Sequence, residues 1–421
     1  MNELALKGGT PIRTAPWPQW PRSTAGLEQQ VIAALRNGRW SISGLATDGH
    51  AAHETQFAHA FAEYNGVEFC IPTANGTSAL MCAMQALDIG AGDEVIVPGL
   101  TWVACATAVM ALNAIPVLVD VDPLSLCLDP AAVRQAITGR TRAIMAVHLY
   151  NAIADLDALL ALSTHAGIPL IEDCAQAHGA RWRGRRVGTI GTVGTFSMQN
   201  GKVLTSGEGG ACICRHGELA DRIYRLRSDG RRLVTQPAPQ GRMDLEDIGG
   251  VFGQNFCLSE IQAAILCSRL ADLDEENAQR AHCADRLRRL LTEIGGFGLQ
   301  QSAPGTEATT LYHFPVRLEG VEFDKLDAST VGAALSAELG CWIHQPYAPL
   351  DQHPLLATGS PRRFAPPAAS VAAHSSLPRA CEAYHRCVVL PHWLFLSSAK
   401  DIDDIAAGFD KVKRSAHRLR T

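Results

Sequence analysis

Short apolar runs alternate with helix-like segments through the middle of this chain, and this alternation constrains its fold more than any other feature. Four such runs are Glu94–Val97, Ile115–Val119, Ala143–Val147 and Pro169–Glu172. Their apolar residues are consecutive rather than alternate, which is typical of strands buried on both faces. Such strands, separated by helices, predict an α/β domain with a mostly parallel central sheet.

The pattern changes after about residue 255. The charge-rich segment Ser259–Leu291 predicts one long helix or two consecutive helices, and a final helix is expected from Lys400 to Arg418. Strand-like pieces at Tyr312–Leu318 and Cys341–His344 lie between them. This part of the chain is therefore expected to form a smaller α+β domain.

The change of pattern predicts a large domain over residues 1–266, which includes an irregular N-terminal segment, and a small C-terminal domain over residues 267–421. Before this boundary, the Gly-, Pro- and Arg-rich stretch Gly230–Gly253 is expected to be a long loop at a surface or subunit contact.

The charge and composition of the chain argue against several classes of binding partner and cellular location. Lys plus Arg total 37 against 42 for Asp plus Glu, so the chain lacks the basic excess that binds a nucleic-acid backbone. No apolar run reaches the ~18 residues of a membrane span, and the N-terminus lacks the apolar core of a signal peptide. The 13 cysteines lie mostly in apolar runs and include no Cys-x-x-Cys pair. They favour reduced, buried thiols, no metal site and a cytoplasmic location.

Lys202 stands in the most informative stretch, F-S-M-Q-N-G-K-V-L-T-S-G-E-G-G-A at residues 196–211. A strand is expected to end at Ser197, and the lysine follows in a glycine-rich turn. Desolvation in such a turn favours the neutral amine, a nucleophile able to form a Schiff base with an aldehyde. A solvated loop lysine is the alternative. A nucleotide-binding P-loop is excluded, because Val203 follows the lysine where that motif needs Ser or Thr.

Asp173 ends an apolar strand in I-E-D-C-A-Q-A-H-G-A, residues 171–180. Enzymes with parallel sheets place catalytic groups at the carboxyl ends of strands. A carboxylate there can hold the ring N–H of pyridoxal phosphate, although a helix-capping aspartate is the alternative. Gln176 could then reach the phenolic oxygen of the cofactor. His178 is expected to be a structural histidine with satisfied hydrogen bonds.

Two turns complete the pattern. Residues 73–80, T-A-N-G-T-S-A-L, open a helix whose free N–H groups suit a phosphate, or simply form a capped helix. Residues 97–104, V-P-G-L-T-W-V-A, place Trp102 after a strand end, where its ring could stack on a cofactor or pack in the core.

Taken in chain order, from the phosphate turn through the aromatic residue and the aspartate to the lysine, the four segments resemble the DegT/DnrJ/EryC1/StrS aminotransferases, the sugar and cyclitol branch of fold-type I pyridoxal-phosphate enzymes. The resemblance implies an aspartate aminotransferase-like fold, pyridoxal 5′-phosphate as cofactor, and a homodimer with a shared active site. Lys202 matches the lysine that binds the cofactor covalently and shuttles the proton, and Asp173 matches the partner of the ring nitrogen. The other implied cofactor-binding positions are Gly76, Thr77 and Ser197 at the phosphate, Gln176 at the phenolic oxygen, Trp102 on the ring, and Asn255 reaching the phosphate of the neighbouring subunit.

Finer features resemble one branch of this family. W-P-Q-W-P, R-W-S-I-S-G and N-F-C-L-S-E-I-Q-A-A-I-L resemble enzymes that transfer the amino group of L-glutamine to the ketone of 2-deoxy-scyllo-inosose or scyllo-inosose in aminocyclitol antibiotic biosynthesis. The small-molecule substrates are expected to contact Ser43, His148, Tyr150, His344 and Tyr347.

Three other interpretations stay open from the sequence. R-W-R-G-R-R-V-G-T also resembles 3-amino-5-hydroxybenzoate synthases, which make an aromatic product. Nucleotide-sugar aminotransferases often carry Asn-x-Arg where this chain has Cys257, which weakens a nucleotide-linked ketosugar as the acceptor. A pyridoxal-binding regulator without turnover is disfavoured, because no DNA-binding segment or basic patch is visible.

Overall fold

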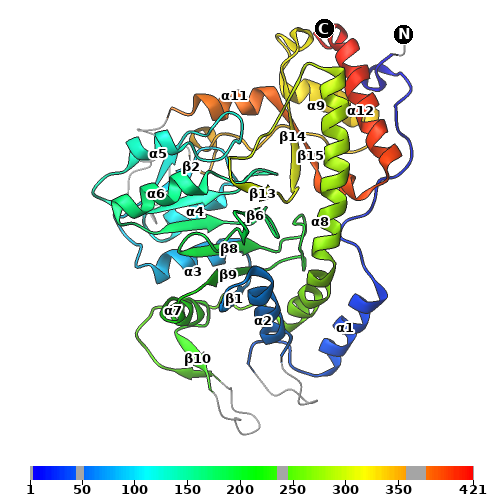
Figure 1. The fold of residues 1–421 in the computed structure, drawn as a ribbon. Coiled ribbons are helices and arrows are strands. Elements are labelled where there is room, and N and C mark those ends of the chain that lie inside the picture. Colours follow the sequence, from blue (N-terminus) through cyan, green and yellow to red (C-terminus); the bar gives the residue numbers. More distant parts are fainter. Residues whose placement is uncertain (1–2, 44–51, 235–244, 357–375, 421) are drawn as a thin grey trace.

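A seven-stranded mixed sheet forms the centre of the larger part of the molecule (Figure 1). The computed structural model describes residues 3–43, 52–234, 245–356 and 376–420. The strand order is β1-β9-β8-β5-β4-β2-β3. The strands are β1 (Phe69–Thr73), β2 (Glu94–Pro98), β3 (Ile115–Val119), β4 (Thr141–Val147), β5 (Leu170–Asp173), β8 (Val193–Ser197) and β9 (Gly210–Cys214).

Most strand pairs in this sheet are parallel. β2 pairs with β3 and with β4, β4 pairs with β5, and β5 pairs with β8, all in parallel. β9 is antiparallel to both β8 and β1. β2 and β9 are buried along their whole length, as strands covered on both faces must be. The predicted α/β architecture with a mostly parallel sheet is confirmed.

The register brings several strand ends to one edge of the sheet. Asp173 at the end of β5 is aligned with Thr195 of β8. Ser197 at the end of β8 is paired with Gly210, which is in turn paired with Thr73 at the end of β1. Segments far apart in sequence therefore leave the sheet side by side.

Polar side chains cap the N-termini of three helices in this part of the molecule. α3 (Gly76–Ala86) begins with a capping box, in which Asn75 Oδ1 accepts from the Ser78 N–H at 2.8 Å and Ser78 Oγ accepts from the Asn75 N–H at 3.1 Å. Asp129 caps α5 (Pro130–Ala136), and Asp155 caps α6 (Leu156–Ala166). α4 (Ala104–Ala111) and α7 (Gly217–Arg227) are further helices of this region.

A helix of 35 residues, α8 (Glu260–Ile294), connects the two parts of the molecule (Figure 1). α1 (Ala25–Arg36) and α2 (His53–Asn65) pack against it. Its Leu266 and Leu273 belong to the apolar core around the sheet, whereas Leu287 and Leu291 belong to a second core. One continuous helix is observed, so the alternative of two helices is wrong. The domain boundary at residue 266 stays a prediction.

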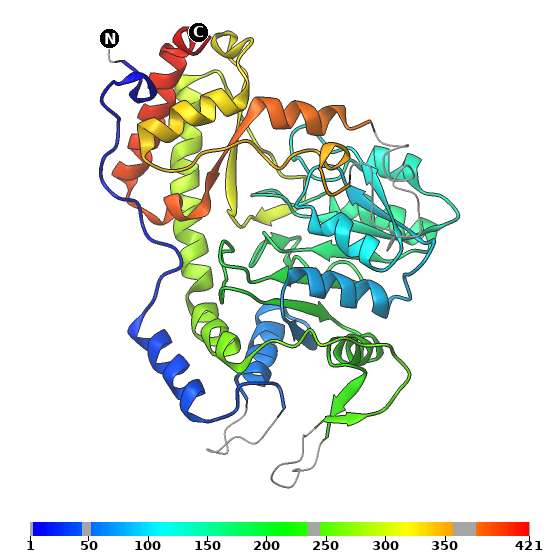
Figure 2. The same cartoon turned by 180° about the vertical axis from the view of Figure 1, so that it is seen from behind.

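The second core lies beside a three-stranded antiparallel sheet. Leu4 of the N-terminal segment is part of this core, and the N–H groups of Ala5 and Ile12 donate to the Glu338 carboxylate. The first and last described residues accordingly lie near each other in both views (Figure 2). The elements of this part are β12 (Phe297–Leu299), β14 (His313–Leu318), β15 (Cys387–Pro391), α9 (Ala328–Leu339), α11 (Pro378–Arg386) and α12 (Ala399–Arg414).

Two local predictions are wrong. Cys341–His344 is not a strand, because the Ile343 N–H donates to the Ser336 hydroxyl at 2.9 Å and only His344 forms a bridge, to Val389. The stretch Gly230–Gly253 is not all loop, since β10 (Arg231–Leu233) pairs antiparallel with β11 (Leu245–Asp247). Residues 235–244 of that stretch lie outside the described residues. Within the described ranges, no helix has both the length and the apolar character needed to cross a bilayer.

Candidate active site

A cavity of about 930 Å³ opens where the strand ends meet. Its wall comes from both parts of the molecule. The larger part contributes the first turn of α3, the turn between β2 and α4, and the ends of β5 and β8, while the smaller part contributes the start of β14 and the loop after α9. The sequence-predicted site residues that line it are Gly76, Thr77, Trp102, Asp173, Gln176, Ser197, Lys202, His344 and Tyr347.

The first turn of α3 fits against β8 and β9 because two positions lack a side chain. A Cβ on Gly76 would lie 2.7 Å from the Cβ of Ser197, and a Cβ on Gly210 would lie 2.4 Å from the backbone of Asn75. A side chain at either position would push these segments apart. The first N–H groups of a helix have no partner within the helix, so those of Gly76 and Thr77 form a cradle suited to an anion.

Lys202 lies in a tightly bonded loop. Its backbone N–H donates to the Gln199 carbonyl at 2.8 Å, and the Thr205 hydroxyl donates to the Met198 carbonyl at 3.1 Å. The side chain is buried, and Nζ lies 4.2 Å from the centroid of the Tyr312 ring. The alternative of a solvated loop lysine is therefore wrong.

The Asp173 carboxylate is buried at the cavity wall and is held by two donors. Oδ1 accepts from the Ala175 N–H at 3.0 Å, and Oδ2 accepts from the Cys105 thiol at 3.2 Å. The next element along the chain is the short strand β6 (Arg181–Trp182), so the alternative of a helix-capping aspartate is wrong. Each oxygen keeps a further lone pair for a ligand.

Gln176 is oriented by Tyr150. Gln176 Oε1 accepts from the Tyr150 N–H at 2.8 Å, which leaves the Nε2 donors toward Tyr347, whose hydroxyl lies 3.4 Å away. The Tyr150 hydroxyl accepts from the Tyr347 N–H at 3.0 Å, and the two rings stack. Tyr150 holds a left-handed φ of +62°, which is a strained conformation for a tyrosine. These contacts join the two parts of the molecule beside the cavity.

Aromatic side chains form another part of the wall. The Trp342 and His344 rings stack at 3.9 Å, and Trp102 meets Tyr347 edge-on at 5.7 Å between centroids. Trp102 is 56% exposed and is not a core residue. His344 Nδ1 lies 2.5 Å from the Gln345 carbonyl, and since that carbonyl can only accept, Nδ1 carries the proton. Burial lowers the pKa of His344, so the neutral ring presents Nε2 as an acceptor.

Four predicted site residues do not line this cavity: Ser43, His148, Tyr150 and Asn255. Ser43 bonds locally to Ser41, and Asn255 is exposed with its Oδ1 accepting from the Cys257 N–H at 3.3 Å. Tyr150 lies behind the wall, where it contacts the lining residues Gln176 and Tyr347.

His148 is turned away from the cavity into a buried group with Glu172 and Cys174. These three residues place ligand atoms within 4.8 Å of one another. The Glu172 carboxylate is, however, already occupied by the N–H groups of residues 188, 190 and 191 and by His148 Nε2. His148 Nδ1 accepts from the Ala154 N–H at 3.3 Å. The hydrogen bonds of Glu172 and His148 are therefore those of a structural network. The predicted contact of His148 with substrate is not supported.

Sequence reasoning missed several residues of the wall. Cys105 was expected to be only a small apolar residue, yet its thiol bonds to Asp173. Tyr312 and Trp342 carried no recognisable motif. His178 was expected to have satisfied hydrogen bonds, but neither of its buried ring nitrogens makes one of normal geometry. Burial instead lowers the pKa of His178 to about 3, so its ring is neutral.

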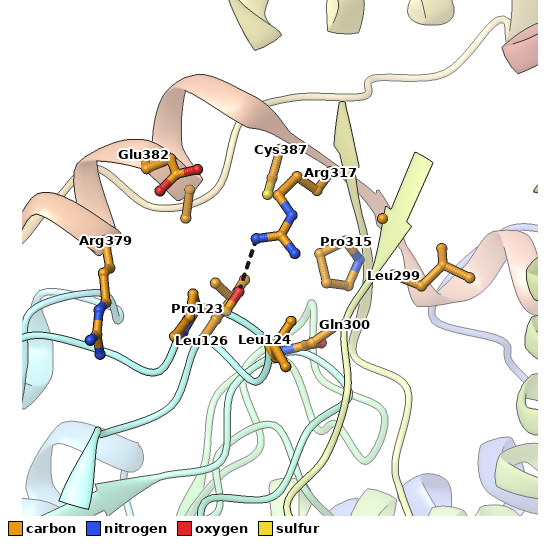
Figure 3. Close-up of a pocket in the computed structure, with 12 residues that line it drawn as sticks. Pro123, Leu124, Leu126, Leu299, Gln300, Pro315, Arg317, Arg379, Glu382 and Cys387 are labelled. Atoms are coloured by element: carbon orange, nitrogen blue, oxygen red, sulfur yellow. Dashed lines mark hydrogen bonds between the residues drawn. The ribbon is translucent and has the colours of Figure 1, made fainter. Parts of the chain in front are cut away.

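A second pocket lies between the loop at residues 123–126 and the sheet of β12, β14 and β15 (Figure 3). Arg317 reaches across it, and its Nη1 donates to the Pro123 carbonyl at 3.3 Å. With a volume of about 20 Å³, this pocket has room for little more than a water molecule. Substrate chemistry therefore belongs to the larger cavity.

Comparison with known proteins agrees with this geometry. Residues 24–410 match the DegT/DnrJ/EryC1/StrS aminotransferase family. The chain belongs to this family. Among its relatives, the L-glutamine:2-deoxy-scyllo-inosose aminotransferase of Streptomyces lividus is 50% identical over 98% of both chains. The L-glutamine:scyllo-inosose aminotransferase of Streptomyces griseus is 46% identical over 98% of this chain and 97% of its own.

A solved structure shows the same architecture. The crystal structure of 3-amino-5-hydroxybenzoic acid synthase superposes with a TM-score of 0.79 at 30% identity, covering 95% of this chain and 99% of that one. The expected fold-type I architecture is confirmed, and this DegT/DnrJ/EryC1/StrS protein is a pyridoxal-phosphate-dependent aminotransferase.

The cavity of this aminotransferase fits pyridoxal phosphate. The cradle that Gly76 keeps open beside Ser197 suits the phosphate, and a buried amine and a buried carboxylate line the same cavity. Trp102 offers a half-exposed aromatic face to a planar ring. These are the donor, acceptor and stacking groups that such a cofactor requires.

Proposed function

We propose that the enzyme transfers the amino group of L-glutamine to a ketone on a cyclitol ring of the 2-deoxy-scyllo-inosose type. The observation that carries this proposal is that Lys202, Asp173 and the α3 cradle line a single cavity. The identity of 50% to an enzyme named for these two substrates supports the choice of donor and acceptor.

Each residue has a distinct task in this proposal. The bound cofactor supplies an electron sink for the electron pair left on carbon when a proton is removed. Lys202 holds the cofactor covalently, and its Nζ, once released, takes the α-proton of the amino donor. Asp173 keeps the ring nitrogen protonated, Gln176 donates to the phenolic oxygen, and the α3 turn holds the phosphate.

The charge of the cavity favours a neutral acceptor. Lys202 is the only lysine or arginine in the described lining of the cavity, and the proposal commits its amine to the cofactor. Burial lowers the pKa values of His313 and His344, so these residues add no positive charge at neutral pH. The pyrophosphate of a nucleotide sugar would thus find no cation in this wall. A polyhydroxyl ring, in contrast, can donate to His344 Nε2 and pack on Trp342.

The same proposal includes a homodimer with a shared site, working in the reducing cytoplasm. Asn255 is exposed and does not line the cavity of its own chain, as expected if it reaches the phosphate bound by a second copy. Phe252, nearby in sequence, is 87% exposed, which suits a residue covered on association. The cysteines are all free thiols, as in a reducing compartment.

The test is a pair of half-reactions with the purified, cofactor-loaded enzyme. L-Glutamine should bleach the absorbance band at roughly 410–420 nm that is characteristic of lysine-bound pyridoxal phosphate. Deoxy-scyllo-inosose should then restore it, and a nucleotide-linked ketosugar should not. No bleaching with glutamine would contradict the donor. Restoration by the nucleotide sugar alone would contradict the acceptor, and an aromatic product would favour the 3-amino-5-hydroxybenzoate type of reaction.

A further inference from the structure

Just after the turn that carries Trp102, a thiol at the start of α4 touches the catalytic carboxylate. Cys105, in the first turn of α4, is 2% exposed and lines the cavity. Its Sγ lies 3.2 Å from Asp173 Oδ2 and 3.3 Å from Thr101 Oγ1. Thr101 is also buried, so the three groups form a chain that is shielded from water.

The direction of each hydrogen bond follows from the chemistry of the groups. An ionised carboxylate can only accept, so the single thiol proton of Cys105 points to Asp173. The sulfur is then free to accept, and the Thr101 hydroxyl is the remaining donor. The chain therefore runs from the Thr101 hydroxyl to the Cys105 sulfur, and from the Cys105 thiol to Asp173.

The thiol keeps its proton under working conditions. Burial, together with the neighbouring Asp173 charge, holds the pKa of Cys105 well above its ordinary value. Cys105 is thus a permanent donor rather than a nucleophile. With the Ala175 N–H on Oδ1, it gives each carboxylate oxygen one donor from the protein.

We propose that Cys105 is a positioning residue, which fixes the Asp173 carboxylate so that its remaining lone pairs face the ring nitrogen of the cofactor. This inference rests on the role proposed above for Asp173. Hydrogen bonds to the charged form stabilise a carboxylate, and two fixed donors also remove its freedom to rotate. The segment from the turn after β2 to the start of α4 would then contribute two residues to cofactor binding. Trp102 would stack on the cofactor ring, and Cys105 would hold Asp173, the partner of the ring nitrogen.

A packing role makes the opposite prediction for two conservative variants. If Cys105 only filled space, Ala would be the milder substitution and Ser the harsher, because Ser adds a hydroxyl to a buried site. If Cys105 is a donor, Ser retains the proton and should be the milder of the two. The order of C105A and C105S therefore separates the two roles.

The experiment measures the pyridoxal phosphate dissociation constant by equilibrium dialysis, kcat with glutamine, and the thermal midpoint for C105A and C105S. Cys82, a fully buried thiol of α3 that does not line the cavity, provides the matched pair C82A and C82S. We expect C105A to weaken cofactor binding about tenfold, the equivalent of one weak hydrogen bond to a charged group, and to lower kcat. C105S should stay within about threefold of the wild type, a residual loss well below one such hydrogen bond.

The control pair should show the reverse order in thermal midpoint, with C82S below C82A, and no change in cofactor affinity. Wild-type cofactor affinity in C105A, or weaker binding by C105S than by C105A, would overturn the proposal. A D173N variant that binds cofactor and turns over normally would instead refute the role of Asp173, so the two failures can be told apart.

Discussion

At the scale of single residues, contacts that leave no room for a side chain decide whether the site can form. Gly76 faces Ser197 and Gly210 faces Asn75 at distances that no Cβ tolerates. Neither glycine has a positive φ, so the requirement is space rather than backbone conformation. The last glycine of the G-E-G-G sequence, Gly210, is thus required because the turn before α3 packs directly against it.

We predict that G76A lowers the affinity for pyridoxal phosphate by about tenfold or more, the value of one charge-assisted hydrogen bond. The added methyl group would displace the cradle from Ser197. Gly26, in the first turn of α1, has open space around its Cβ position and provides the control G26A. Fluorescence titration of the cofactor measures both variants. Equal affinities for G76A and G26A would contradict the steric account.

The positions of site residues could be predicted from the sequence where a motif has fixed spacing. Lys202, Asp173 and the α3 turn stand in local motifs, and the structure brings them to one cavity. The hydrogen bond between Cys105 and Asp173 joins residues 68 positions apart, and no local sequence motif can predict such a contact. His148 likewise pairs with a residue distant in sequence, Glu172 of β5, and does not line the cavity.

At the scale of elements, prediction succeeded where burial sets the pattern. The strands β2, β3, β4 and β5 are apolar runs within a covered sheet, and each of the four was located to within two residues. Cys341–His344 also contains apolar residues, but its Ile343 N–H donates to the Ser336 hydroxyl of α9 and not to a neighbouring strand. β10 and β11 are short and charged, so no apolar alternation marks them. Tertiary contacts decided these segments.

An ion pair buried among α2, β1 and α7 should be essential for stability. Arg227 Nη1 donates to Glu54 Oε1 at 2.6 Å and to the Pro72 carbonyl at 2.5 Å, and both side chains are nearly inaccessible. R227M would leave the Glu54 charge unpaired, and we expect about 3–5 kcal/mol of destabilisation in urea unfolding.

Two comparisons make that prediction specific. The exposed pair of Arg222 and Asp88 is the matched control, and R222M should change the unfolding midpoint little. The double variant E54L/R227M should recover much of the loss, because it removes both charges together. Equal effects of R227M and R222M would show that the buried pair has no special importance.

At the scale of the whole molecule, the cavity takes its wall from both the larger and the smaller part of the chain. α8 contributes apolar residues to both cores. Beside the cavity, the Tyr347 N–H of the loop after α9 donates to the Tyr150 hydroxyl, which follows β4. The sheet ends and α3 carry the groups proposed for the cofactor, and the loop after α9 carries Trp342 and His344, which are proposed for the acceptor. This division lets one part hold the chemistry while the other sets the choice of substrate.

The chain is well suited to a direct test of its central claim. It contains only six lysines, and Lys202 is the only one between residues 8 and 324. Reduction of the cofactor-loaded, full-length enzyme with borohydride converts a lysine-bound Schiff base into a stable secondary amine, which peptide mass spectrometry can locate. The account predicts the pyridoxyl group on Lys202 alone, and no label in K202A. A label on any other lysine, or none in the wild-type enzyme, would contradict it.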